Sequence, residues 1–267
     1  MIPHSLTEEN YFSPENNRKY LGSSQFKSFL RCESAALAEL NGEYQREVTD
    51  ALLIGSYVDA HYEGTLDIFK AQHPELFTRS GELKAQYKHA EYMIQRAERD
   101  ELFSRYMAGE KQVIMVGEIA GSPYKIKIDS YHPDSCIVDL KCVRDFKSLW
   151  NEEKECRQHF IDYWGYTVQG AIYREIVRQN TGKVLPFYIA AITKEKEPQL
   201  RIYWIPDEVL DDRLSEVITL TPRMQRIKDG GLTPQRCGNC SFCRFTEVLT
   251  GPVNYLEELE VYDGDEG

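Results

Sequence analysis

The sequence lacks any apolar run long enough to form a membrane-spanning helix. The longest apolar stretch without a charge, residues 184–193, has about half of the roughly 20 residues that such a helix needs. Residues 1–10 have neither the basic start nor the apolar core of a secretory signal peptide. We therefore expect a protein of the cytoplasm that has no membrane partner.

Basic residues are scarce relative to acidic ones. The 267 residues include 32 Lys and Arg against 43 Asp and Glu, which gives a formal net charge of -11. This balance excludes a nucleic-acid-binding surface that is basic all over, although it is compatible with a local basic groove. With 42% hydrophobic residues, the chain can build one large core or two small ones.

The chain contains no internal repeat and no low-complexity segment. We expect one domain over residues 1–255 and an acidic, flexible tail over 256–267. Within the domain we distinguish a helical part (20–110), a catalytic core (111–205), and a C-terminal helix with a cysteine-rich loop (206–245).

Two kinds of hydrophobic spacing alternate along the chain. Apolar residues at helical spacing predict helices over 24–40, 51–70, 83–107, 146–159, 163–179 and 206–228. Alternating segments predict strands over 113–119, 124–131, 136–142, 185–193 and 200–205. The first three strands are expected to form an antiparallel meander, so the predicted class is α/β (α+β), with a central mixed sheet flanked by helices.

Two aspartates lie on neighbouring predicted strands. If the oily faces of the two strands pair and residues 133–135 form the loop, Asp129 lies directly across from Asp139. Cross-strand partners are about 5 Å apart at their Cβ atoms, so two ionised carboxylates there repel each other unless a cation or a proton intervenes. Mg²⁺ or Mn²⁺ is the natural neutralising ion.

Lys141 follows Asp139 on the same face of its strand. Its ammonium group can orient a water molecule or stabilise negative charge on a phosphate in the transition state. Together these residues provide the parts for phosphodiester hydrolysis. Without further signals, the alternative is a solvated strand face of mixed charge.

Four short motifs resemble, in order and spacing, the RecB-type branch of the PD-(D/E)XK nuclease superfamily. They are 55–61 with His61, 127–129 with Asp129, 137–141 with Asp139 and Lys141, and 169–173 with Gln169 and Tyr173. The resemblance spans residues 24–243 and implies a restriction-endonuclease-like core. Within that branch the chain is most similar to phage and prophage recombination exonucleases of the RecE (exonuclease VIII) type.

The resemblance assigns a role to each motif residue. It implies that His61, Asp129 and Asp139 bind the catalytic metal ion and that Lys141 assists the attacking water. Gln169 and Tyr173 would line the site from one helix, since residues i and i+4 share a helix face. A lone helical histidine is otherwise more often a surface or capping residue, and a tyrosine on an amphipathic helix often simply packs.

Glu118 is a secondary candidate for a third carboxylate of the site. Its place ahead of Asp129 is one of the features in which the chain resembles the RecE-type enzymes. A tight turn at residues 121–122, however, would place Glu118 opposite Lys125 rather than opposite Asp129.

The seven cysteines are not expected to form disulfides in the cytoplasm, so metal binding is the better question. Cys237, Cys240 and Cys243 supply three thiolates within one loop, and a closed structural site normally needs a fourth. Cys136, Cys142 and Cys156 are scattered and have no such spacing.

A further resemblance, to iron–sulfur RecB-like nucleases such as AddB, supplies Cys32 as the fourth ligand. It implies a [4Fe-4S] cluster that joins the two ends of the domain. The spacing between Cys240 and Cys243 is narrower than in those proteins, so Zn²⁺ remains the alternative. A third possibility is a triplet without metal, with Cys32 packed in a helix interface.

The expected function is that of a Mg²⁺-dependent DNA exonuclease, which produces single strands for phage-type recombination or repair. DNA phosphates would be bound by Lys125, Lys127, Arg144 and Lys147. The resemblance also implies a RecT-like single-strand annealing protein as a partner and a homo-oligomer around DNA. The alternatives are a catalytically silent DNA-binding scaffold and a nuclease of the CRISPR spacer-acquisition type.

Overall fold

The computed structural model describes residues 6–152, 154–252 and 254–256. Its first part is helical, with α1 (Pro14–Lys19), α2 (Ser23–Arg31), α3 (Glu33–Asn41), α4 (Asp50–Glu63), α5 (Leu66–Gln72), a 3₁₀ turn (Pro74–Leu76), α6 (Ala85–Glu98) and α7 (Glu101–Tyr106). Six strands follow, namely β1 (Val113–Ile119), β2 (Ser122–Ile128), β3 (Ser130–His132), β4 (Cys136–Val143), β5 (Leu149–Asn151) and β6 (Cys156–Gln158). The chain continues through α8 (Phe160–Tyr163), α9 (Tyr166–Thr181), β7 (Phe187–Thr193), β8 (Leu200–Ile205), α10 (Asp207–Lys228) and α11 (Ser241–Phe245).

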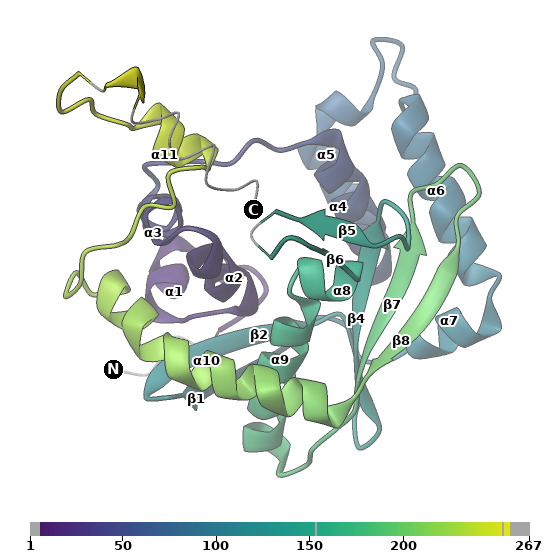
Figure 1. The fold of residues 1–267 in the computed structure, drawn as a ribbon. Coiled ribbons are helices and arrows are strands. Elements are labelled where there is room, and N and C mark those ends of the chain that lie inside the picture. Colours follow the sequence, from purple (N-terminus) through teal and green to yellow (C-terminus); the bar gives the residue numbers. More distant parts are fainter. Residues whose placement is uncertain (1–5, 153, 253, 257–267) are drawn as a thin grey trace.

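The central sheet is mixed and has the strand order β3-β4-β7-β8. β4 and β7 run parallel, and the segment between them crosses over through α9, while the other pairs are antiparallel. Helix α9 lies between the sheet and α10, and α4 and α6 cover the opposite side (Figure 1). The predicted class, a mixed sheet flanked by helices, is confirmed.

Each face of the central sheet packs into its own hydrophobic core. The α9 side contains Ile137 and Ile189 together with Ile172. The α4 and α6 side contains Leu140 and Ala190. Adjacent residues of β4 therefore alternate between two cores, which explains why its sequence is nearly continuously apolar.

Three long predicted helices are each interrupted by a local backbone signal. The helix over 24–40 breaks at Cys32, whose extended backbone ends α2 while its thiol accepts a hydrogen bond from the N–H of Ala35. The helix over 51–70 breaks at Gly64, which adopts a φ of +78°. The helix predicted over 83–107 breaks at Asp100, whose side chain caps the start of α7.

The helix predicted over residues 146–159 is wrong, because this segment forms the β5–β6 hairpin. Phe146 and Leu149 pack against the core, and their spacing of three residues is the feature that was interpreted as helical. Trp150 is exposed, and the hairpin turns near Glu155 at a φ of +49°. Two inward residues do not distinguish a helical turn from a short hairpin.

The β3–β4 hairpin has the expected three-residue loop at 133–135, with Ser130 opposite Val138. The preceding β1–β2 hairpin differs from the expectation, since Ala120 and Gly121 form a two-residue turn with φ of +49° and +76°. Glu118 therefore pairs with Pro123 rather than with Lys125. The meander also divides, because β1–β2 and β3–β4 belong to different sheets.

No helix among the described residues is long and apolar enough to cross a lipid bilayer. From residue 257 onward, the predicted acidic tail lies outside the described residues.

Candidate active site and cysteine cluster

The candidate active site lies where β2 and β3 diverge. β3 pairs with β4 only as far as Ser130 opposite Val138, so the following residues of β4 have β7 on one side and an open edge on the other. Asp129 stands at this fork, and its Oδ2 accepts a 2.8 Å hydrogen bond from the backbone N–H of Leu140. Continuing the same register by one residue places Asp129 opposite Asp139.

Asp139 is almost fully buried, at 1% exposure, and both of its oxygens face charged or polar groups. Its Oδ1 accepts a 2.5 Å hydrogen bond from Nε2 of Gln169 on α9. Its Oδ2 forms an ion pair with the Lys141 ammonium but accepts no hydrogen bond from the described residues. One buried carboxylate oxygen thus retains capacity for a cation.

Burial and the charge of Asp139 both act on the carboxyl group of Asp129. Burial, together with the nearby charge of Asp139, raises the pKa of Asp129 to about 7. Burial alone would lower the pKa of Lys141, but Asp139 and Asp129 outweigh it and raise this pKa above its ordinary value. The site therefore contains a charged lysine and more carboxylate than that lysine neutralises.

Helix α4 adds two carboxylates that were not identified from the sequence. Asp59 and Glu63 are four residues apart, so they share one face of the helix, and both line the cleft. Burial and the charge of Asp129 raise the pKa of Asp59 to about 8. This i, i+4 acidic pair, next to the histidine that was chosen, is the signal that could have identified them.

The structure does not bring His61 to the other site residues. His61 is two residues from Asp59, which is about 200° around the helix, so the two side chains point in opposite directions. Nε2 of His61 lies 2.9 Å from Oε1 of Glu98 on α6, and His61 does not line the cleft. From α4, Asp59 lines the cleft, whereas His61 does not.

Gln169 and Tyr173 lie one turn apart on α9, and both face the cleft. The hydroxyl of Tyr173 donates a 2.9 Å hydrogen bond to the carbonyl oxygen of Lys127. Gln169 therefore orients the carboxylate of Asp139, while Tyr173 holds the end of β2 against the helix.

Two of the predicted DNA-binding lysines are already engaged within the protein. Lys125 is only 3% exposed, and its ammonium donates hydrogen bonds to the carbonyl of Tyr11 and to Oδ1 of Asn17. It is therefore not available to a phosphate, contrary to the expectation. Nζ of Lys127 lies 3.5 Å from Oε1 of Glu63, and Lys127 lines the cleft.

Three other predicted residues lie outside the cleft. Arg144 is exposed and pairs with Asp145 at 3.0 Å, and Lys147 is exposed nearby. Glu118 is exposed on β1, where its backbone N–H and C=O both bond to the side chain of Gln179. Arg144 and Lys147 are placed to contact a substrate only beyond the cleft, and Glu118 is not part of the acidic cluster.

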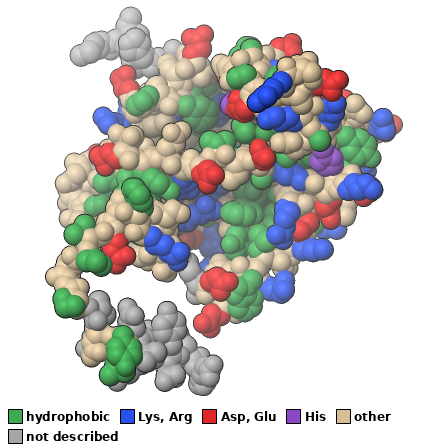
Figure 2. Space-filling model, turned by 90° about the horizontal axis from the view of Figure 1, so that it is seen from above, with side chains coloured by type: hydrophobic (Ala, Val, Ile, Leu, Met, Phe, Trp, Pro, Cys, Tyr) green, Lys and Arg blue, Asp and Glu red, His purple; other side chains and the backbone are tan. Residues whose placement is uncertain are grey.

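The acidic residues and Lys141 open into one cleft with a volume of about 870 Å³. It is lined by α1 to α5 on one side and by β2, β4 and α9 on the other. Figure 2 shows the hollow near the middle of one face, with Lys and Arg side chains along its border. Asp59, Asp129 and Asp139 line this cleft, and carboxylate oxygens are the ligands that Mg²⁺ or Mn²⁺ prefers.

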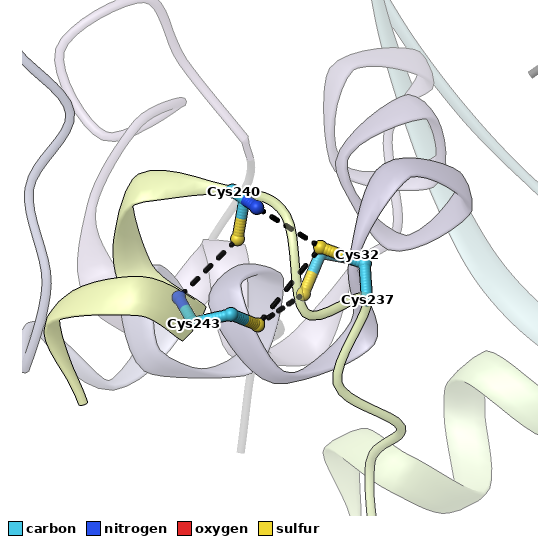
Figure 3. Close-up of side chains that lie close together, drawn as sticks. All are labelled: Cys32, Cys237, Cys240 and Cys243. Atoms are coloured by element: carbon cyan, nitrogen blue, oxygen red, sulfur yellow. Dashed lines mark hydrogen bonds between the residues drawn. The ribbon is translucent and has the colours of Figure 1, made fainter. Parts of the chain in front are cut away.

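The four predicted cysteine ligands come together in a second site. The sulfur atoms of Cys32, Cys237, Cys240 and Cys243 all lie within 4.8 Å of one another (Figure 3). Cys32 lies between α2 and α3, whereas the other three lie in the loop before α11 and in α11 itself. The site therefore joins segments that are 211 residues apart.

The sulfur–sulfur distances of this site can be compared with the spacing that each predicted metal group needs. Sγ of Cys243 lies 3.6 Å from Sγ of Cys32 and 3.9 Å from Sγ of Cys237. Four sulfurs around one Zn²⁺, with bonds of about 2.3 Å at tetrahedral angles, lie about 3.8 Å apart. A [4Fe-4S] cubane places a different iron atom in front of each thiolate and so requires wider spacing. The residues therefore match a single tetrahedral ion better than a cluster.

Comparison with known proteins gives three results. No curated protein matches the chain. A crystal structure from Eubacterium rectale, described as a "Putative exonuclease", has a TM-score of 0.90 and 46% sequence identity over 95% of this chain and 98% of its own. The structure of SSO0001 aligns with 86% of this chain and 97% of its own at 15% identity and a TM-score of 0.31, which is too low to carry an argument.

The family comparison covers most of the chain. Residues 22–246 match the model of a PDDEXK-like domain of unknown function, DUF3799. The matched range includes the acidic cleft and all four cysteines of the second site. The chain is a member of this PDDEXK-like family.

Proposed function

We propose that the protein is a metal-dependent deoxyribonuclease that hydrolyses phosphodiester bonds at DNA ends. The observation that carries this proposal is the convergence of Asp129 and Asp139 at the open edge of β4, with Lys141 paired to Asp139. The family supports the nuclease fold, and the name of the Eubacterium rectale neighbour supports an exonuclease.

Asp59, Asp129 and Asp139 would hold Mg²⁺ or Mn²⁺. The bound ion would activate a water molecule and neutralise charge on the phosphate. Gln169 fixes the carboxylate of Asp139 through Oδ1, which leaves Oδ2 paired with Lys141, where it would also be available to the ion.

Lys141 supplies the remaining positive charge. Because Asp139 and Asp129 raise its pKa, it remains an ammonium at neutral pH and can donate a proton or a hydrogen bond to an oxygen of the reacting phosphate. Its side chain is 19% exposed, so it reaches the cleft while its stem remains covered.

The test compares an end-labelled linear duplex with a covalently closed circle, each incubated with Mg²⁺. Wild type is expected to shorten the linear duplex and leave the circle intact. The Asp139→Asn variant should lose more than about 100-fold in rate, since a metal ion contributes several kcal/mol to the transition state. Equal, absent activity in both proteins would favour the silent DNA-binding scaffold, and cutting of the circle would exclude a requirement for ends.

We further propose that the cysteine cluster holds one structural Zn²⁺. This proposal departs from the [4Fe-4S] cluster expected from the sequence, and the sulfur spacing supports it. Four further expectations rest on the resemblance alone. They are the production of single-stranded DNA, a RecT-like annealing partner, a homo-oligomer around DNA, and the alternative function in CRISPR spacer acquisition.

A further inference from the structure

Lys27 is a cation beside the candidate active site that takes no part in the proposed hydrolysis. Lys27 extends from α2, and its Nζ lies 5.2 Å from the centroid of the Tyr166 ring. Nζ of Lys141 lies 5.1 Å from the same centroid. Two ammonium groups therefore share one aromatic ring, and Lys27 has no ion pair or hydrogen bond within the described part of the chain.

Packing fixes the position of Lys27. Gly165 adopts a φ of +63°, which few other residues tolerate, and a Cβ at this glycine would lie 3.0 Å from Cδ of Lys27. The aliphatic stem of Lys27 thus lies directly on the glycine. The ammonium is held near the site rather than free to extend into solvent.

The charge of Lys27 lacks a counterpart. Burial and the nearby charge of Lys141 lower the pKa of Lys27 to about 8, although Asp139 acts in the opposite direction. A phosphate group bound by Lys27 would offset the repulsion from Lys141 and keep Lys27 charged.

An aromatic surface adjoins this position. Trp164 directly precedes Gly165 and is 40% exposed. Arg31 lies one turn after Lys27 on α2. Its guanidinium carbon is 5.5 Å from the centroid of the Trp164 ring. Exposed aromatic rings next to Lys and Arg are the surfaces on which unpaired bases stack.

We propose that Lys27 and Trp164 form a subsite for the nucleotide next to the scissile bond, in which Lys27 binds its phosphate and Trp164 stacks its base. The proposal rests on the proposed nuclease function and adds to it that the strand is unpaired where it enters the site. A base inside a duplex is stacked between its two neighbours and does not expose its face to Trp164.

Binding of a fluorescein-labelled single strand, measured by anisotropy at several salt concentrations, tests the subsite. All variants carry Asp139→Asn so that no strand is cut. Lys27→Met should weaken binding about tenfold and reduce the slope of log K against log salt by about 0.7, which is the effect of one lost phosphate contact on a single strand. Trp164→Ala should weaken binding by about tenfold or more and leave the slope unchanged.

Two further variants exclude a merely structural effect. Lys27→Arg retains the charge and should keep the slope of the parent. Lys88 is an exposed lysine on α6, and Lys88→Met should change neither the affinity nor the slope. The subsite is overturned if Lys27→Met keeps the parent's slope, whether or not its affinity falls, or if Trp164→Ala binds like the parent. Cleavage by wild type is scored separately, so an inactive wild type would refute the nuclease function without deciding the subsite.

Discussion

At the scale of single residues, the site depends on which face of α4 points toward the strands. Asp59 and Glu63 face the cleft, and His61, between them in sequence, faces Glu98. The motif pointed to this helix, but its histidine lies on the face that contacts Glu98. Only the position of the neighbouring helices decides which face is turned inward, and that position is not visible in a local spacing.

We expect Asp59→Asn to lose more than about 100-fold in Mg²⁺-dependent cleavage, because an amide cannot replace the charge of a carboxylate ligand. His61→Ala should retain activity within about threefold, since its side chain contacts Glu98 outside the cleft. Initial rates on end-labelled duplex at several Mg²⁺ concentrations measure both. A large loss in His61→Ala with normal cleavage by Asp59→Asn would reverse this assignment.

The other site residues were easier to predict. Asp129, Asp139 and Lys141 follow from strand alternation and from a three-residue hairpin loop, both of which are local. Gln169 and Tyr173 come from the resemblance, and their i, i+4 spacing on one helix agrees with it. Lys125 was misjudged as free because its partner, the segment around Tyr11, is more than a hundred residues away in sequence.

At the scale of elements, Gly170 sets the distance between α9 and β7. A Cβ at this position would lie 2.6 Å from Cδ1 of Phe187 and 3.0 Å from Cδ2 of Leu210. We expect Gly170→Ala to lower the free energy of unfolding by about 1–3 kcal/mol through overpacking. Urea unfolding followed by circular dichroism measures the loss.

The effect of Gly170→Ala should also reach the active site, because Gln169 precedes this glycine and holds Asp139. Cleavage should therefore fall at a temperature where the variant is still fully folded. Ala108→Gly is the control, because residue 108 lies in the loop between α7 and β1 and the substitution leaves the contact between α9 and β7 intact. Stability and rate equal to wild type in Gly170→Ala would show that the helix moves aside without cost.

The cysteine cluster ties α2 and α3 to the segment before α11. We expect purified protein to be colourless and to contain one zinc per chain, and we expect metal removal by a chelator to lower the melting temperature. Cys32→Ser should have the same effect, because three thiolates do not close a tetrahedral site. Cys156→Ser, an exposed cysteine on β6, is the control.

Metal analysis by mass spectrometry, combined with a melting curve, decides the cysteine prediction. A brown preparation with four iron atoms per chain would replace zinc by the cluster. Unchanged melting after complete metal removal would show that the thiols have no structural role.

At the scale of the whole molecule, the N-terminal segment is held against the cleft by two lysines, of which Lys125 is buried and Lys228 is partly buried. Lys125 bonds to Tyr11 and Asn17, and Lys228 of α10 bonds to the carbonyl oxygens of Asn17 and Tyr20. Burial lowers the pKa of each lysine to about 8. The segment and α10 are thus joined through charges that are costly to bury.

These pKa values give a pH dependence of known sign. Between about pH 8 and pH 10.5 the unfolded chain retains a proton on Lys125 that the folded chain has lost, so this group makes the free energy of unfolding rise with pH. We expect the stability of wild type relative to Lys125→Met to increase over this window. Urea unfolding at pH 7.5 and pH 9.5 measures it, with Lys88→Met as the control.

A constant or shrinking difference between wild type and Lys125→Met would show that Lys125 stays protonated in the folded protein. In that case its hydrogen bonds to Tyr11 and Asn17 outweigh the cost of burial.

The fold could be predicted in class and order but not in its breaks and pairings. Strand and helix periods placed β1, β8 and α10 almost to the residue, because each repeats over six or more residues. The β5–β6 hairpin and the change of sheet at Asp129 were missed, since both are decided by contacts with distant segments.

The order of the four cysteines along the chain bears on how the protein matures. During synthesis Cys32 emerges early, whereas its three partners emerge only after the sheet and all the helices that surround it. A chain that ends before residue 237 contains every residue that lines the acidic cleft but only one of the four clustered cysteines. Capture of the proposed ion would therefore be the last step of assembly, and metal starvation would leave a folded chain whose cysteine site is open.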